Sequence, residues 1–392
     1  MSRLGLIATC CAVLLSASVA DAADGTIKLG LLAELSGPFA PSGNGERNGL
    51  QIYLNRHGGM LGGLKVTIVT EDTAGDPATA ITKVKKLVES DKIDVLIGPT
   101  SSATGAAIKD YVNEHQIPTL IESTVDEVVQ GKYMFRTTFA GNAEGYLEGF
   151  LPAKAGYRKA VLIAPNYIAG QEAVNYFEKG FVAGGGTVVQ KLMPRLGAPD
   201  FGSFIGQISS DADVAIVFMP GTDGLRFIKQ YADYGKKLPM YGFTVTVDEQ
   251  QLSAEGEAAT GFIGASFYFS TIDTPENKEL MKEWGAGYQG QEKPSWQTLG
   301  GIIAAQVLDG AIGRIKGNIA DKDALLKAIA ETRMTTPAGS FRYDDDHNPI
   351  MPRYIMQIRD VGGVVQPVIL SVLPEFIPKL EAPALPAGIV LK

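Results

Sequence analysis

The segment IKLGLLAELSGPFAPSGNGERNGLQIYLNRHGG, from Ile27 to Gly59, decides the fold. Residues 27–32 are almost all apolar and predict a buried β-strand. A turn rich in glycine, serine and proline follows, and the pattern over residues 45–57 predicts a helix. A strand that leads directly into a helix is half of a β-α-β unit. The segment therefore indicates a parallel sheet with crossover helices.

The same alternation continues along the chain in two series. The first predicts strands over 65–71, 95–97 and 118–121, and helices over 76–90 and 102–114. The second predicts strands over 160–164, 187–192, 214–218 and 240–241, and helices over 170–183, 201–210 and 224–234. Two such series predict an α/β protein with two doubly wound parallel-sheet lobes, and ligands at the carboxyl ends of the strands.

The last third of the chain does not alternate strands with helices in this way. It predicts helices over 276–290, 296–313 and 321–330, a β-hairpin over 336–346 and a strand over 353–360. Residues 374–392 are rich in proline and predict an extended C-terminal tail.

The N-terminus resembles a secretion signal. Arg3 precedes a mostly apolar run over residues 4–20, and Ala20-Asp21-Ala22 supplies the small-x-small pattern that signal peptidase reads. We therefore expect residues 1–22 to be a signal peptide, cleaved after Ala22, and the mature chain to be periplasmic. An uncleaved anchor is the alternative. No later apolar run is long enough to span a membrane, so no insertion is expected after cleavage.

Composition argues against several classes of function. The only cysteines, Cys10 and Cys11, lie in the leader, so the mature chain would have no disulfide and no thiolate site. The net charge of −8 argues against nucleic acid or an anionic membrane as the main partner. The three histidines stand in no motif with a nucleophile or a metal ligand. We expect no enzymatic activity, no metal and no cofactor.

Three polar turns each follow a predicted strand, over residues 35–43, 97–104 and 122–124. Backbone N–H groups at a helix start, with neighbouring hydroxyls, bind an anion without a basic side chain. Any one of these hydroxyls can equally be a helix N-cap. Because neighbouring parallel strands bring the turns together, we interpret the three as a site for a small carboxylate.

Several of these motifs, in this order and spacing, resemble the leucine/isoleucine/valine-binding-protein family. These are type I periplasmic binding proteins of ABC importers. The similar pieces are Leu35-Ser36-Gly37-Pro38 after the first strand, Asn55-Arg56-His57-Gly58-Gly59, Glu71-Asp72, Ile97-Gly98-Pro99 and Phe135-Arg136-Thr137. The resemblance covers nearly the whole mature chain. It implies a monomeric, two-lobed binding protein whose partners are a small ligand and the membrane subunits of an importer.

The resemblance also implies roles for single residues. Ser102 matches the serine that holds the ligand carboxylate, with Thr100 and Ser101 contributing at backbone level. Ser123 and Thr124 match a small-residue–Thr pair whose threonine is the second carboxylate clamp.

Two positions depart from the amino-acid-binding members. Phe243-Thr244 stands where those proteins carry a glutamate for the ligand ammonium, and a threonine cannot pair with a buried cation. Ala169 replaces the usual aromatic residue before the glycine, with Tyr167 two places upstream. We therefore expect an aromatic carboxylate, such as a benzoate or a phenylpropenoate, rather than leucine.

The candidate walls for such a ring are aromatic, and core packing is the alternative reading for each of them. They are Phe39, Phe139, Tyr167, Phe243 and Trp296. Ser42 and Gln297 complete the candidate contacts. Glu122 leaves the alternative open, because pointing inward it would replace the missing glutamate and restore an amino-acid ligand.

Three crossovers, near residues 138–143, 270–274 and 346–351, are expected to form a hinge. The N-terminal lobe would comprise 23–140 and 274–348, and the C-terminal lobe 141–273 and 349–373. Closure would bury the ligand between Ser102 and Thr124 on one side and Tyr167, Pro220 and Thr244 on the other. A ligand-sensing domain of the same fold is a further alternative.

Overall fold

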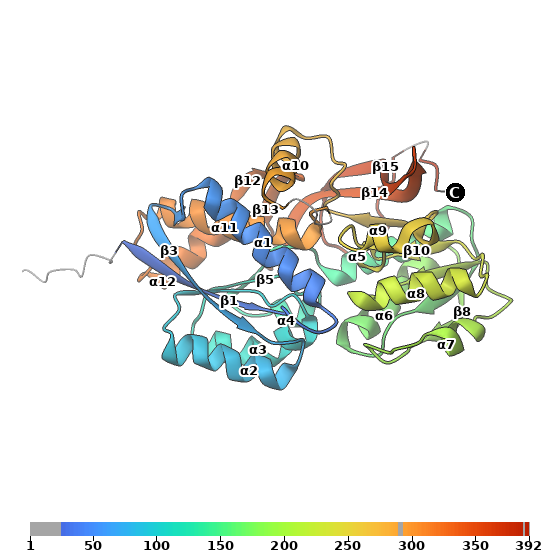
Figure 1. The fold of residues 1–392 in the computed structure, drawn as a ribbon, viewed down its shortest axis with the longest axis horizontal. Helices are drawn as coiled ribbons and strands as arrows, with labels where there is room; N and C mark the ends of the chain where they lie inside the picture. The colour runs from blue at the N-terminus through green and yellow to red at the C-terminus, as the bar shows by residue number, and fades with distance from the viewer. Residues whose placement is uncertain (1–24, 289–292, 387–388, 392) are drawn as a thin grey trace, which may run out of the picture.

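The computed structural model describes residues 25–288, 293–386 and 389–391, and shows two sheets side by side (Figure 1). The predicted leader, with Cys10 and Cys11, lies outside the described residues. The predicted α/β class with two doubly wound, mostly parallel sheets is confirmed.

The first sheet has the order β2-β3-β1-β4-β5-β6, parallel except for β2. We call this sheet and its helices the first lobe. Its strands are β1 (Thr26–Ala33), β2 (Met60–Leu61), β3 (Leu64–Asp72), β4 (Val95–Ile97), β5 (Thr119–Ile121) and β6 (Met134–Arg136). Its helices are α1 (Ala40–Arg56), α2 (Pro77–Lys85, continued by a π-turn over Lys86–Ser90), α3 (Ser102–Glu114) and α4 (Asp126–Val129).

The second lobe is built on the parallel strands β8-β7-β9-β10-β11. These are β7 (Lys159–Ile163), β8 (Thr187–Leu192), β9 (Val214–Val217), β10 (Met240–Gly242) and β11 (Ile263–Ser266). Its helices are α5 (Gly141–Lys154), α6 (Ile168–Ala183), α7 (Gly202–Gly206), α8 (Thr222–Asp233) and α9 (Leu252–Glu255).

The last third returns to both lobes, as the orange and red segments of Figure 1 show. Helices α11 (Trp296–Arg314) and α12 (Lys322–Ala330) join the first lobe, after α10 (Pro275–Gly287). The hairpin β12 (Arg333–Thr336) and β13 (Gly339–Tyr343) leads into β14 (Pro349–Val361), which pairs antiparallel with β11 and with β15 (Val364–Phe376). The residues at which one lobe gives way to the other stay a prediction.

Several predicted elements differ from the structure: helix α1 begins at Ala40 rather than at residue 45, and β14 begins at Pro349 rather than at residue 353. The helix expected over 201–210 is only Gly202–Gly206, because glycine stands at both ends. The hairpin expected over 336–346 spans 333–343, with its turn at Pro337-Ala338. Strand β15 runs into the predicted tail as far as Phe376, since an edge strand that pairs only with β14 tolerates proline.

Helices α1 and α11 pack very closely in the first lobe. A Cβ on Gly49 would lie 1.9 Å from the carbonyl oxygen of Thr298, and one on Gly301 would lie 2.1 Å from that of Glu46. Only glycine allows this approach. The close contact brings the start of α11 beside the start of α1, where a cavity opens between the lobes.

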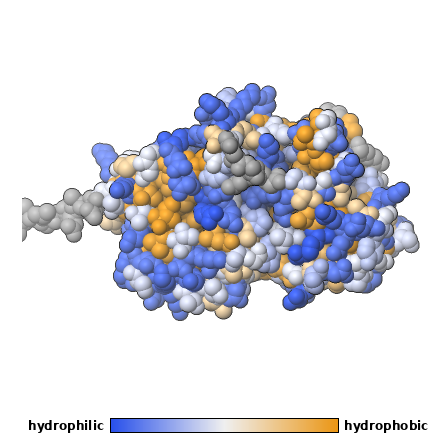
Figure 2. Space-filling model, in the orientation of Figure 1, coloured by the Kyte–Doolittle hydropathy of each residue, from blue (hydrophilic) through white to orange (hydrophobic). Residues whose placement is uncertain are grey.

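Figure 2 shows polar residues spread over both lobes on this face, with apolar patches between them. Among the described residues, no helix is both long and apolar enough to cross a membrane.

A buried ion pair in the second lobe joins α5 to β14. Arg353 of β14 donates from Nε to Glu144 Oε2 of α5 at 2.7 Å, and both side chains are 1% exposed. The guanidinium carbon lies 5.8 Å from the ring centre of Phe267, directly after β11, and 5.0 Å from that of Phe376. Burial raises the pKa of Glu144, and the charge of Arg353 opposes that rise.

We predict that Arg353→Met lowers the free energy of unfolding by about 3–5 kcal/mol, because the Glu144 carboxyl then stays buried without its partner. Urea denaturation measures the change. Arg359→Met is the control, since Arg359 is exposed on the same strand and its side chain donates to Gln357. Equal midpoints for the two variants would contradict this role of Arg353.

Candidate functional site

A cavity lies between the carboxyl ends of the two sheets, with about 450 Å³ of space between its walls, including the part open to solvent. Eleven of the residues predicted from sequence line it: Phe39, Ser42, Thr100, Ser101, Ser102, Thr124, Tyr167, Ala169, Pro220, Phe243 and Trp296. Phe139, also predicted as a wall, lines it too, as do Phe218 and Val245, which the sequence did not single out. None of these side chains carries a charge at neutral pH.

Aromatic rings from both lobes form most of the wall. Phe139 lies edge-on to Phe243 across the cleft, with ring centres 5.9 Å apart, and edge-on to Trp296 at 5.4 Å. Phe39 of the first lobe faces Tyr167 of the second at 6.4 Å. Edge-to-face rings at these spacings make a rigid apolar box suited to a planar ring.

The serine and threonine hydroxyls of the cavity come from the first lobe, and the second lobe adds the phenol of Tyr167. Ser102 opens α3, and its Oγ receives a hydrogen bond from Ser123 Oγ at 3.0 Å. Ser123 therefore lies behind the wall and supports Ser102. The Ser101 hydroxyl is buried and has no hydrogen-bond partner among the described residues. Hydroxyls at the positive end of a helix favour an anionic or strongly accepting group.

Thr100 and Ser101 were predicted to contribute at backbone level, but in this structure their N–H groups already have an acceptor. Their N–H groups donate to Glu34 Oε2, at 3.0 and 3.3 Å, and the Thr100 hydroxyl donates to it at 2.7 Å. Thr104 and Thr73 donate to the other oxygen of Glu34. This fully buried carboxylate already occupies the N-terminus of α3. Sequence reasoning missed Glu34, although a carboxyl directly after an apolar strand was a visible signal.

Glu122 does not point into the cavity, so it cannot take the part of the missing glutamate. A Cβ on Gly300 of α11 would lie 2.2 Å from Glu122 Oε1, which places the carboxyl against that helix. Burial, and then the charges of Glu46 and Glu34, raise the pKa of Glu122 well above its ordinary value. Neither of its oxygens has a hydrogen-bond partner.

The remaining two predicted residues lie just behind the wall. Val245 lines the cavity instead of Thr244, because β10 ends at Gly242 and a 3₁₀ turn over Thr244–Val247 replaces the alternation of a strand. Gln297 supports the wall by donating to Ser42 Oγ at 3.1 Å.

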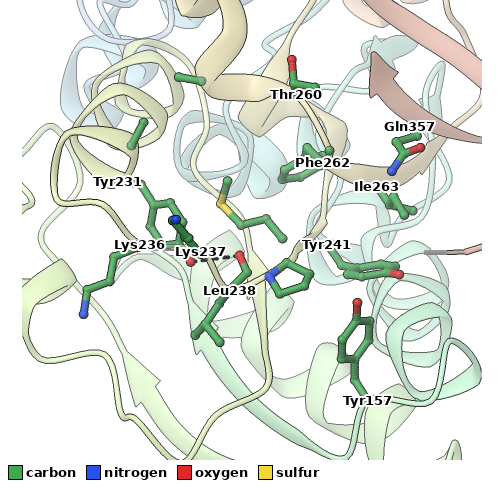
Figure 3. A pocket seen from close by; sticks show the side chains of 15 residues that line it. Tyr157, Tyr231, Lys236, Lys237, Leu238, Tyr241, Thr260, Phe262, Ile263 and Gln357 are labelled. Carbon is green, nitrogen blue, oxygen red and sulfur yellow. Dashed lines mark hydrogen bonds between the residues drawn. The ribbon is translucent and has the colours of Figure 1, made fainter. Parts of the chain in front are cut away.

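A second cavity lies at the opposite end of the second lobe (Figure 3). It opens where β10 begins at Met240 and β11 begins at Ile263, and Tyr157 and Tyr241 meet edge to face in its wall, 5.8 Å apart. Ligands of doubly wound sheets bind at the carboxyl ends of the strands, so the cavity between the lobes is the candidate site.

Known proteins share this architecture. A family model described as periplasmic binding protein matches residues 26–363. A relative from Brucella melitensis, named Leu/Ile/Val-binding protein homolog 6, is 26% identical over 358 residues, which are 89% of this chain and 91% of its own length. The resemblance to Leu/Ile/Val-binding proteins is thereby confirmed.

Two solved structures extend the comparison. A solute-binding protein of an ABC transporter from R. palustris, in complex with benzoate, is 32% identical with a TM-score of 0.85, covering 90% of this chain and 97% of that one. An ABC transporter substrate-binding protein from Sphaerobacter thermophilus is 30% identical with a TM-score of 0.83, covering 91% and 100%. Since the family match takes in every strand from β1 to β14, the chain belongs to the periplasmic binding protein family.

Proposed function

We propose that this protein is the exported solute-binding component of an ABC importer and that it holds a small aromatic carboxylate between its lobes. The observation that carries the proposal is the lining of the cavity: aromatic rings from both lobes, serine and threonine hydroxyls from the first lobe, and no charged side chain among the described lining residues. The benzoate bound by the R. palustris relative supports the same class of ligand. A benzoate or a phenylpropenoate fits this description.

In this proposal binding involves no covalent chemistry. The ligand carboxylate accepts hydrogen bonds from Ser102, Thr124 and the hydroxyl of Ser101, which has no partner among the described residues. The ring lies between the aromatic walls of the two lobes. Specificity follows because a ligand without an acceptor leaves these buried hydroxyls unpaired.

A branched-chain or other amino acid is the second candidate, and the name of the Brucella melitensis relative favours it. An ammonium group inside the closed cavity would need a carboxylate or several carbonyl acceptors. No carboxylate lines the described cavity, and Glu122 faces α11. The aromatic acid is therefore preferred.

Export and assembly belong to the same proposal. Residues 1–22, outside the described part of the chain, act as a signal peptide that is cleaved after Ala22. The mature protein works as a monomer in the periplasm and delivers its ligand to the membrane subunits of the importer.

We predict that benzoate raises the melting temperature and that leucine and valine do not, because a ligand that binds only the folded state stabilises it. Differential scanning fluorimetry measures the shifts. Benzamide keeps the ring but lacks the charged carboxylate, and should give a much smaller shift. Stabilisation by leucine without any by benzoate, 4-hydroxybenzoate or cinnamate would refute the aromatic ligand.

Ser102→Ala should weaken benzoate binding by about 1–3 kcal/mol, the usual effect of leaving a buried acceptor without its donor. Isothermal titration calorimetry gives the affinities. Ser203→Ala, an exposed serine in α7 of the other lobe, serves as the matched control and should bind as the wild type does. If the two variants have equal affinities, Ser102 is not a clamp.

Glu122→Gln should leave benzoate affinity unchanged and make stability less dependent on pH. Because burial raises the pKa of Glu122, the folded protein binds a proton that the unfolded chain releases above about pH 4.5, so its free energy of unfolding falls as pH rises beyond that value. The variant lacks this contribution. Urea titrations between pH 5 and 8 test the slope, and a lost ligand affinity would place Glu122 in the site.

A further inference from the structure

Gln250 reaches from the second lobe into the first. It stands between the 3₁₀ turn after β10 and helix α9, and its Nε2 donates to Ser295 Oγ, at the start of α11, at 2.8 Å. A Cβ on Gly45 of α1 would lie 2.5 Å from the same nitrogen. The side chain therefore fits into a space that a glycine leaves open, and the contact exists only when the lobes are together.

The hydrogen bonds continue from Ser295 to the cavity. Ser295 Oγ donates to Gln297 Oε1 at 2.6 Å, and Gln297 Nε2 donates to Ser42 Oγ at 3.1 Å. Ser295 and Gln297 are almost completely buried, whereas Ser42 lines the cavity. A chain of three hydrogen bonds thus connects a residue of one lobe with the ligand-facing wall of the other.

The buried carboxyl of Asp248 lies beside this chain. Burial raises its pKa to about 6, its Oδ1 accepts from the backbone N–H of Gln250 at 2.9 Å, and its Oδ2 has no hydrogen-bond partner among the described residues. Ser295 uses its one proton on Gln297 and accepts from Gln250, so the amide oxygen of Gln297 faces Ser295 and its amide nitrogen faces Ser42.

The same count of protons applies to Ser42, at the other end of this chain of hydrogen bonds. Ser42 Oγ accepts a hydrogen bond from Gln297. Among the described residues, none accepts a side-chain hydrogen bond from the Ser42 hydroxyl. That proton is free for the cavity. Hydrogen bonds that run in one direction polarise one another, so each strengthens the next.

We propose that Gln250 is a positioning residue, which on lobe closure completes the chain to Ser42 and fixes the Ser42 hydroxyl as a donor to an acceptor atom of the ligand. The inference rests on the proposed function and deepens it. Ser42 held as a donor selects an oxygen of a carboxylate or of a ring substituent and disfavours an ammonium. The donor becomes oriented only in the closed, ligand-holding state.

A double-mutant cycle tests the proposal with benzoate as the probe, by calorimetry on the full mature chain. Gln250→Ala and Ser42→Ala should each weaken binding about 3- to 10-fold, the range of one net hydrogen bond, and the double variant should be no weaker than the worse single one. Gln250→Glu keeps the size but cannot donate to Ser295, and should lose as much as Gln250→Ala. Gln190→Ala is the control. It loses hydrogen bonds to the Gln207 carbonyl and the Ser209 N–H, both within the second lobe, and should bind benzoate normally.

Additive losses in the double variant, or full affinity in Gln250→Glu, would overturn the proposal. Melting temperatures of the ligand-free variants, expected within a few degrees of the wild type, separate lost positioning from a damaged fold. If wild-type protein does not bind benzoate, the proposed ligand is wrong, and the same cycle is repeated with leucine, whose carboxylate offers the same acceptor to Ser42.

Discussion

The ion pair between Arg353 and Glu144 is the interaction on which the packing of the second lobe depends. Removing two charges from water is unfavourable, and only a close partner offsets it. Here the pair joins the start of α5 to β14, while rings that follow β11 and end β15 pack on the guanidinium. The helix that begins the second lobe is thereby held against the strand that returns to it late in the chain.

Much of this architecture could be predicted from the sequence because it depends on local signals. The strands at 95–97 and 187–192 and helix α3 were predicted with the observed bounds, since apolar runs end there at turn and cap residues. The hydroxyls of Ser102 and Thr124 were found because parallel strands bring their turns together. Glu34, Val245 and Gln250 were not, since a side chain's direction after an irregular turn depends on contacts distant in sequence.

The cavity is free of charge although several carboxyls surround it. Glu34 takes hydrogen bonds at the start of α3, and Glu46 and Glu122 lie buried beside it, with burial raising the pKa of both. Helix α11 and its glycines separate Glu122 from solvent. These carboxyls lie behind the wall of the cavity. They help to hold the donor groups in place and do not face the ligand. The described lining of the cavity thereby presents hydroxyls and apolar, mostly aromatic surface.

Trp296 gives this arrangement an optical consequence. It is one of two tryptophans, it lies in the cavity wall, and it contacts Phe139 edge to face, whereas Trp284 is buried in α10 away from the site. Its indole emission changes whenever a ring or a water molecule replaces another neighbour in the cavity. The protein thus contains its own fluorescent reporter of occupancy, and rapid-mixing measurements can follow capture and release without any attached dye.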